Sequence, residues 1–236
     1  NDGIIANQAN LTAHYGSGSV RHDVVAGLEL SRETSKNFAR VESGSSSPVS
    51  PNTDFFHPDP YDAYTGTIAR TGAFTDASAR SAGVYAFDTL ALGAKWQLTG
   101  GLRWDRFAVD YESVSVGAVS TALARTDRMV SGRAGAAYKP REQGSLYVGY
   151  ATSFTPSAEG LSLSASTVNL EPEKTRNFEA GTKWDFMGDR LSVNGAAFRT
   201  EKTNARTPGL NAGDPPTVLQ GKQVVDGIEL GLSGTI

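Results

Sequence analysis

The chain has 236 residues, of which 39% are hydrophobic, and a formal net charge of −3. That length fits one all-β domain or two small domains, and the charge balance provides no basic surface for nucleic acid. No cysteine is present, which excludes disulfides, thiol nucleophiles and cysteine zinc sites.

No apolar segment approaches the roughly 20 residues of a transmembrane helix, and the longest lies around VVAGLEL. A transmembrane β-strand needs only about 9–11 residues with one apolar face. Glycine accounts for 26 of the residues, a share above the usual roughly 7% that favours strands and turns. The chain starts at Asn1 without Met or a signal peptide, so we expect a processed protein or a fragment.

Apolar residues recur at every second position in nine segments, the pattern of strands with one apolar face. In chain order the segments are 11–15, 24–30, 85–91, 96–104, 130–138, 146–154, 178–186, 191–197 and 228–236. In the third segment the alternating residues are Tyr85, Phe87, Thr89 and Ala91, and we expect them on the apolar face.

The connections between these segments are alternately short and long. The short ones are 16–19, 92–95, 139–144 and 187–190, and the long, polar ones are 37–76, 113–126, 156–172 and 206–218. This sorting predicts an up-and-down meander with all short turns at one end, as in outer-membrane barrels. Soluble β-sandwiches mix both lengths at both ends.

Two of the short connections place glycine first in the turn, at Gly93-Ala94 and Gly188-Asp189, which predicts type II′ hairpin turns. The first turn sets Ala91 opposite Trp96. The second sets Trp184 opposite Val193 and, one step beyond the apolar band, Arg176 opposite Glu201.

The apolar face has small residues in its middle and aromatic residues at its ends. Lipid tails adapt to such a surface, whereas a soluble core needs interlocking bulk. The opposite face carries polar and charged residues that a dry core would not hold unpaired, namely Asp88, Thr99, Arg103, Asp105, Glu179 and Lys183. We therefore expect lipid against the first face and a wet or polar lumen against the second. A water-soluble sheet with one face packed on another element is the alternative.

Six stretches carry a family resemblance: RHDVVAGLELSRE, YAFDTLALGAKWQLTGGLRWDRF, SLYVGYATSFTPSAEG, LEPEKTRNFEAGTKWDF, RLSVNGAAFRTEKTNART and VVDGIELGLSG. In this order and spacing they resemble the barrel of the TonB-dependent siderophore receptors, in the branch for catecholate and related siderophores. The resemblance covers nearly the whole chain.

The resemblance implies a single-chain barrel of about 22 strands in the bacterial outer membrane, with its lumen plugged by an N-terminal domain. The chain departs from that pattern. No plug domain or TonB-box segment precedes Asn1, nine is an odd number of strands, and Ile236 ends the chain without an aromatic residue. We expect residues 1–236 to be an internal part of the barrel, with the plug and the remaining strands outside this chain.

The resemblance also implies a function, the uptake of ferric siderophores energised through TonB, with long extracellular loops that capture the ligand. Iron would then arrive chelated by the siderophore. A passive porin-type channel or a barrel adhesin is the alternative, and a plug with a TonB-box segment upstream would decide against it. The implied partners are the ferric siderophore, the TonB complex and outer-membrane lipid, and we expect a monomer that binds no nucleic acid.

No catalytic pattern, metal site or cofactor loop stands out, so we expect neither an enzyme nor a bound cofactor. A ferric catecholate is anionic and aromatic, so arginine and aromatic side chains near the lumen mouth are candidates for contact with it. The candidates are Phe55, Phe56, Tyr61, Tyr64, Arg80, Arg103, Arg106, Tyr111, Arg125, Phe154 and Arg206. For each one, a rim salt bridge or loop packing is the competing role.

The three histidines receive separate interpretations. His14 and His22 flank a turn, and we expect them in the rim or the aromatic girdle. His57 lies near Asp54, Asp59 and Asp62, where an ordinary polar loop is the expectation and a cation site the alternative.

Overall fold

The computed structural model describes residues 1–44, 54–61, 66–117, 119–165, 167–207, 217–218 and 221–235. Nine long strands form one antiparallel sheet in the order β1-β2-β3-β4-β5-β6-β7-β8-β11. Their bounds are β1 Asp2–Ser17, β2 Val20–Ser43, β3 Thr67–Leu92, β4 Trp96–Val114, β5 Ser120–Arg141, β6 Gly144–Thr155, β7 Glu173–Phe186, β8 Leu191–Thr203 and β11 Lys222–Gly234. Two short strands, β9 (Arg206–Thr207) and β10 (Thr217–Val218), pair with each other.

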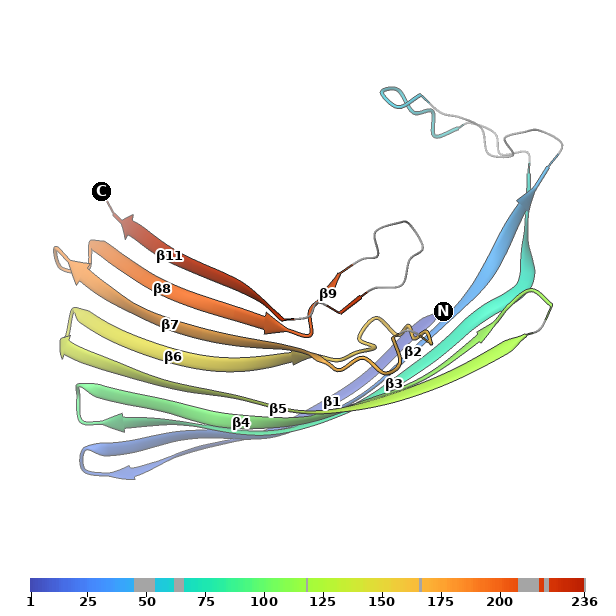
Figure 1. Cartoon of the computed structure of the whole chain (residues 1–236). Coiled ribbons are helices and arrows are strands. Elements are labelled where there is room, and N and C mark those ends of the chain that lie inside the picture. The colour runs from blue at the N-terminus through green and yellow to red at the C-terminus, as the bar shows by residue number, and fades with distance from the viewer. Residues whose placement is uncertain are drawn as a thin grey trace.

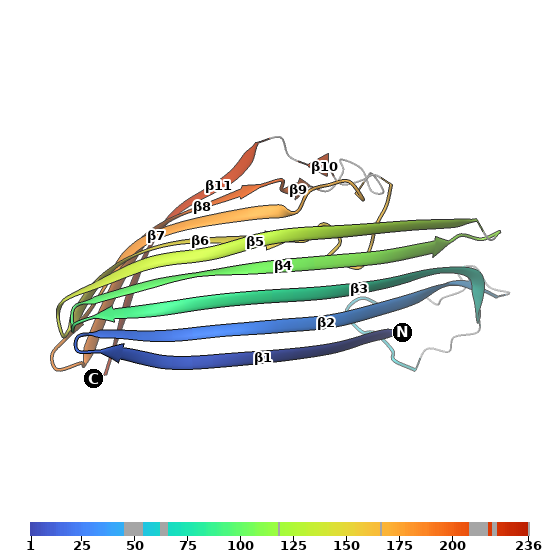
Figure 2. The same cartoon turned by 90° about the horizontal axis from the view of Figure 1, so that it is seen from below.

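The sheet bends into a trough whose two edges are β1 and β11 (Figure 1). All the short hairpin connections lie at one end of the trough and the longer ones at the other end (Figure 2). The predicted all-β, up-and-down arrangement is confirmed. In the part of the chain that the structure describes, no helix is long and apolar enough to cross a membrane.

The strands are longer than the sequence analysis expected at the end with the long connections. Only residues 115–119 join β4 to β5, instead of 113–126, and much of 37–76 belongs to β2 and β3. The reason is that apolar and polar residues continue to alternate beyond the apolar band, but there the apolar residues face inward and the polar residues face outward. Val109 is 1% exposed and faces inward, whereas Asp110 beside it is exposed and faces outward. Beyond the apolar band, the apolar side chains turn toward the lumen.

The register of β7 and β8 agrees with the prediction. Trp184 lies opposite Val193, and Arg176 lies opposite Glu201. The ion pairs of Glu201, however, are with other residues, since Lys222 Nζ lies 2.7 Å and Arg199 Nε 3.2 Å from its Oε1. The hydrogen bond from Lys222 holds the pKa of Glu201 below its usual value.

The predicted register of β3 and β4 is wrong by one residue. Three residues, 93–95, connect the strands, so Leu92 lies opposite Trp96. A slip of one residue turns every side chain of a strand to the other face. Tyr85, Phe87, Thr89 and Ala91 therefore face the lumen, and Asp88 faces outward. The type II′ prediction for Gly188-Asp189 is also wrong, because φ is positive at Met187, Gly188 and Asp189 (56°, 63° and 66°), whereas a type II′ turn has positive φ only at its first central residue.

Asp88 finds a partner on the outward face close to the short turns. Its Oδ2 lies 2.6 Å from Nδ1 of His22, and the His22 ring stacks on Tyr15 with centroids 4.8 Å apart. The structure thus places His22 in the aromatic girdle. His14 lies on the inward face, 2.6 Å from Asp23.

The outward face carries a band of exposed apolar side chains. Its members include Leu28, Leu30, Val84, Leu98, Leu102, Val130, Leu146, Val148, Ile228, Leu230 and Leu232. Aromatic residues border the band. Trp96 packs on Tyr138 at the short-turn end, with ring centroids 4.6 Å apart, and Trp104, Tyr150 and Phe178 lie exposed at the other end. This is the surface that we expect to meet lipid.

The inward face holds a hydrogen-bonded polar network instead. Gln8 Nε2 donates to Glu29 Oε1 over 3.0 Å and to the Tyr85 hydroxyl over 3.1 Å. Arg103 Nη2 lies 2.6 Å from Glu29 Oε2. Charges in this network are paired, as a polar lumen wall requires.

Aromatic rings on the inward face lie across glycines of neighbouring strands. A Cβ atom added to Gly27 would come within 2.4 Å of the Tyr85 ring, and one added to Gly181 within 2.5 Å of the Tyr147 ring. These glycines let the rings lie flat against the wall.

The two ends of the trough can be assigned by labelling. A cysteine replacing Ser162, in the connection between β6 and β7, should react with an impermeant thiol reagent on whole cells. One replacing Asp189, in a short turn, should react only after the outer membrane is permeabilised. The chain has no native cysteine, so each label reports one site. The opposite pattern would invert the orientation.

Candidate functional site

The connection between β6 and β7, residues 156–172, folds back over the inward face of the sheet (Figure 1). Ala158 and Leu163 are only 2% and 4% exposed, and they form a buried cluster with Ala79 and Val109. The partly buried side chains around this cluster are Phe107, Tyr111, Leu123 and Leu161. We call residues 156–172 the inward loop. It explains the exchanged alternation of β4, because its apolar side chains pack on those of the strand.

A buried carboxylate anchors the start of the inward loop. The Asp127 side chain is 1% exposed, and its Oδ2 accepts hydrogen bonds from the backbone N–H of Ser157, at 2.8 Å, and from the Ser157 hydroxyl. Its Oδ1 accepts one from Arg125 Nε at 2.7 Å. Arg125 Nη1 in turn donates to the carbonyl of Val168 at 2.7 Å, so one ion pair ties down both halves of the loop.

Arg206, at the start of β9, ties the loop from the other side. Its Nη1 donates to the carbonyl of Ser157 at 2.6 Å, and its backbone N–H donates to Glu173 Oε1 at 2.8 Å. Burial raises the pKa of Glu173, but hydrogen bonds from Lys202 and from the Arg206 amide outweigh that effect and hold the pKa below its usual value. Nε and Nη2 of Arg206 are buried and have no hydrogen-bond partner among the described residues.

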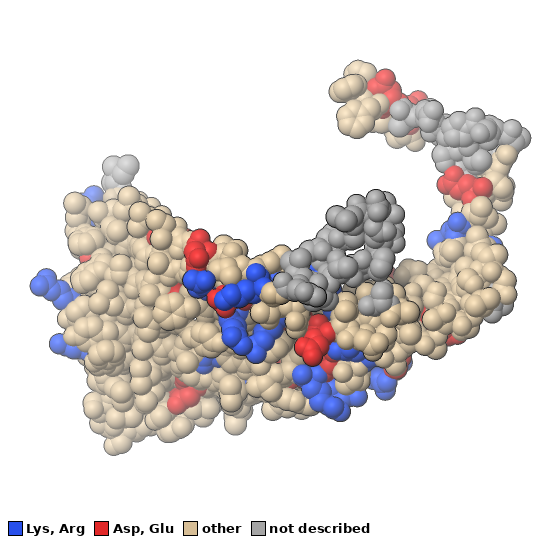
Figure 3. All heavy atoms as spheres, viewed as in Figure 1, with Lys and Arg blue, Asp and Glu red and all other residues tan. Residues whose placement is uncertain are grey.

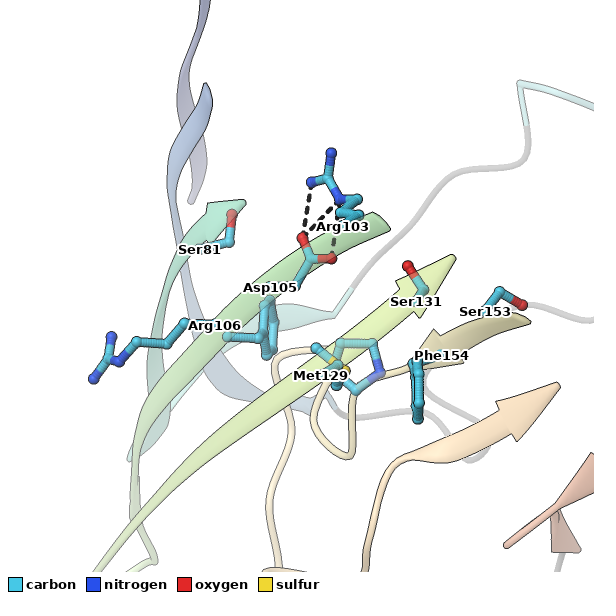
Figure 4. A pocket seen from close by; sticks show the side chains of 10 residues that line it. Ser81, Arg103, Asp105, Arg106, Met129, Ser131, Ser153 and Phe154 are labelled. Carbon is cyan, nitrogen blue, oxygen red and sulfur yellow. Dashed lines mark hydrogen bonds and ion pairs between the residues drawn. The ribbon is translucent and has the colours of Figure 1, made fainter. Parts of the chain in front are cut away.

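Three cavities lie beside the inward loop among the described residues, and two of them contain predicted candidate residues. One, of about 400 Å³, lies between the loop, Glu173 and Arg206. The other, of about 300 Å³, is lined on the strands by Ser81, Arg103, Asp105, Phe107, Met129 and Ser131, and closed by Phe154 and Pro156 (Figure 4). Apolar walls with a few charged groups are typical of small-molecule sites.

Arg103 is already neutralised within the second cavity. Its Nε lies 2.9 Å from both carboxylate oxygens of Asp105 (Figure 4). Its Nη2 donates a hydrogen bond to Glu29 Oε2. Two carboxylates share one guanidinium, so this cluster carries a net negative charge. Arg103 therefore has little capacity left for an anionic ligand.

The structure separates the other predicted candidates into three groups. Phe154 borders the second cavity, but it has the parity of Tyr150 on β6 and so belongs to the outward face, where Lys174 Nζ lies 5.3 Å from its ring centroid. Tyr111, Arg125 and Arg206 support or anchor the inward loop. Arg80 and Arg106 lie on the outward face and are thus not placed to contact a ligand in the lumen.

Figure 4 shows the Arg106 side chain pointing away from Arg103 and Asp105, on the other side of β4. Arg80 forms an ion pair with Asp110 at 2.7 Å on the same outward face. For both residues the physical reason is parity, since they hold even positions on strands whose odd positions face the lumen.

Between β2 and β3 the structure describes residues 44, 54–61 and 66 of the longest connection. Phe55, Phe56 and Tyr61 are 90%, 81% and 90% exposed, and Tyr64 and Asp62 lie outside the described residues. Asp54 Oδ1 accepts the backbone N–H groups of Phe56 and His57. In the described part of the chain, no group of three or more His, Asp or Glu side chains could hold a metal ion.

Sequence reasoning missed Asp127 and Ser157. Arg125 and Asp127 are two residues apart on one strand and so share a face, a signal that could have identified the pair. The contact with Ser157 depends on the return of the loop, for which the sequence pattern gives no signal.

The comparisons with known proteins extend over the whole chain. Residues 2–235 match the family model described as TonB dependent receptor-like, beta-barrel. The chain is 31% identical over 261 aligned positions to the catecholate siderophore receptor Fiu of Escherichia coli K12, covering 99% of this chain and 33% of that protein. It is 40% identical over 171 positions to the probable TonB-dependent siderophore receptor PiuA of Acinetobacter baumannii, covering 68% of this chain and 22% of that protein.

Solved structures of these relatives share the fold. The closed form of the ferric-catecholate import receptor Fiu from E. coli K12 has a TM-score of 0.80 at 30% identity, covering 100% of this chain and 36% of that one. The siderophore receptor PiuA has a TM-score of 0.81 at 28% identity, with the same coverage. The chain spans about a third of the length of the curated Fiu relatives that it matches.

Proposed function

Because the chain belongs to the TonB-dependent receptor-like β-barrel family, whose members lie in the bacterial outer membrane, we propose that it forms part of a receptor that imports ferric siderophores. The observation that carries the proposal is similarity along its full length to relatives named as catecholate siderophore receptors. The reaction is transport, and the iron crosses as the chelated cargo of the siderophore.

The proposed receptor contains more than these residues. The sheet has two edges, β1 and β11, each bonded to one neighbour, and the relatives are about three times as long. We propose that further strands close the barrel, that a plug domain fills it, and that TonB supplies the energy by acting on the plug. The polar inward face supports this, because it offers a plug many hydrogen-bonding groups.

For ligand contact we propose Arg206 beside the inward loop, with Phe55, Phe56, Tyr61 and Tyr64 in the longest loop. Arg206 keeps two buried nitrogens free for an anion, and Phe55, Phe56 and Tyr61 offer exposed rings. An anionic aromatic chelate suits both features. We assign Arg103, Tyr111 and Arg125 to the support of the wall and the inward loop.

A passive channel is the competing function, and energy dependence separates the two. We expect a strain lacking the receptor to regain uptake of radiolabelled ferric catecholate when it carries the full-length receptor, and to lose it again when TonB is inactivated. Uptake that persists without TonB would indicate a porin. Absence of uptake for every catecholate tested would contradict the proposed substrate class.

A further inference from the structure

Four arginines lie close together on the outward face, just beyond the apolar band. They are Arg32 on β2, Arg80 on β3, Arg106 on β4 and Arg128 on β5, and we call them the arginine belt. Each lies two residues beyond the band on its strand: Leu30 precedes Arg32 and Trp104 precedes Arg106, whereas on the antiparallel strands Ala82 follows Arg80 and Val130 follows Arg128. Neighbouring strands lie about 4.8 Å apart, so the four Cα atoms fall within roughly 16 Å.

The belt contains two pairs of like charges in direct opposition. Arg32 lies opposite Arg80, and Arg106 lies opposite Arg128. Like charges at directly opposed positions of an antiparallel pair destabilise a sheet. An anion bound between the paired guanidinium groups would relieve this repulsion.

Carboxylates within the protein do not fill that role. Arg80 pairs with Asp110 at 2.7 Å, whereas Arg32, Arg106 and Arg128 have no hydrogen bond or ion pair with any described residue. The other residues that continue these cross-strand rows carry no charge. They are Ile5 opposite Arg32, Ala108 opposite Arg80, Ala82 opposite Arg106, and Thr126 opposite Ala108. Three guanidinium groups therefore remain available.

The location of the belt indicates which anion it meets. It lies near the middle of β2 and β3, on the side of the apolar band toward the long connections, and it faces away from the lumen, as Figure 4 shows for Arg106. Lys and Arg atoms line this convex margin in the space-filling view (Figure 3). A side chain directly above a lipid-facing band reaches the head groups of the outer leaflet.

We propose that the arginine belt binds the phosphate groups of an anionic glycolipid in the outer leaflet of the membrane. The planar guanidinium group matches phosphate oxygens with two parallel hydrogen bonds, and clusters of basic residues beside a membrane span bind anionic head groups. Two arginine pairs on adjacent rows fit a head group with two phosphates. This binding does not involve the siderophore, so it stands or falls independently of the transport function.

The test uses the full-length receptor in detergent and a purified diphosphorylated glycolipid such as lipid A. Native mass spectrometry and titration should show binding by the wild type, and about a hundredfold weaker binding by the triple variant Arg32→Gln, Arg106→Gln, Arg128→Gln. The affinity of the corresponding Arg→Lys variant should lie between those of the wild type and the Gln variant. Lysine keeps the positive charge but lacks the planar guanidinium group that forms two parallel hydrogen bonds with phosphate. Both variants should fold, since they leave the apolar band intact.

The matched control replaces Arg21, Arg141 and Arg190 by Gln. These arginines are exposed at the short-turn end and form no ion pair with a described residue, so the change in charge is the same and the affinity should stay within about twofold. Equal affinity of the belt variant and the wild type would overturn the proposal. So would equal binding of the dephosphorylated glycolipid, or displacement of the lipid by inorganic phosphate at matched concentration, since the latter would indicate a site for free phosphate.

Discussion

Replacing Ala134 by Arg should cost about 2–4 kcal/mol of the free energy of unfolding of the full-length receptor in lipid vesicles. Ala134 is exposed on the outward face of β5, four residues from Val130 and four from Tyr138. It therefore lies at the middle of the apolar band, where a guanidinium group meets hydrocarbon. Urea unfolding of the refolded receptor, followed by tryptophan fluorescence, measures the change.

The control for this substitution is Ala137→Arg on the same strand. Ala137 faces inward, opposite Gln97 and Tyr147, so the new charge meets the polar lumen and we expect a cost below about 1 kcal/mol. The comparison involves one residue type, one strand and one added charge, and it differs only in the face. Equal costs at the two positions would overturn the assignment of the faces.

Replacing Asp127 by Ala should release the inward loop. The substitution removes the acceptor for Ser157 and leaves Arg125 without its carboxylate, and breaking a buried ion pair on one side costs about 3–5 kcal/mol. The amide of Ser157 and its neighbours should then exchange with deuterium more than about a hundredfold faster, and residues 156–172 should become sensitive to protease added outside the cell.

Asp110→Ala provides the comparison for this second result. Asp110 also pairs with an arginine, Arg80, but both side chains are more than half exposed, and such a pair contributes about 0–1 kcal/mol. We expect no change in the exchange of the inward loop. If Asp127→Ala leaves the exchange as slow as in the wild type, the apolar cluster alone holds the loop and the ion pair has no anchoring role.

The sequence allowed the sheet to be predicted because the alternation is an intrinsic property of each strand. In the hairpin of β7 and β8, the alternation and the turn were enough to predict every residue pair correctly, as far as the pair of Arg176 and Glu201. The hairpin of β3 and β4 shows the limit. Its turn has three residues instead of two, and both faces of residues 84–92 contain apolar side chains, so the pattern did not reveal the slip.

The candidate site was predicted less well, because it depends on contacts between segments far apart in the chain. The three inward-facing or loop-anchoring arginines were chosen for their charge, but Arg103 and Arg125 are bound by carboxylates of their own wall. Arg206 alone retains buried nitrogens without a partner among the described residues. These ion pairs join residues that come together only in the folded sheet, so the sequence pattern could not show which arginines would already be paired.

The rings that lie across Gly27 and Gly181 also limit how far side chains project from the inward face of the trough. Because each ring lies flat against a glycine that has no side chain, it projects from the inward face by little more than the thickness of the ring. A methyl group at either glycine would lift the ring off the wall, because the added carbon would lie 2.4–2.5 Å from ring atoms. The clearance for a passing solute can therefore change through substitutions in the wall that alter no charge and touch no solute.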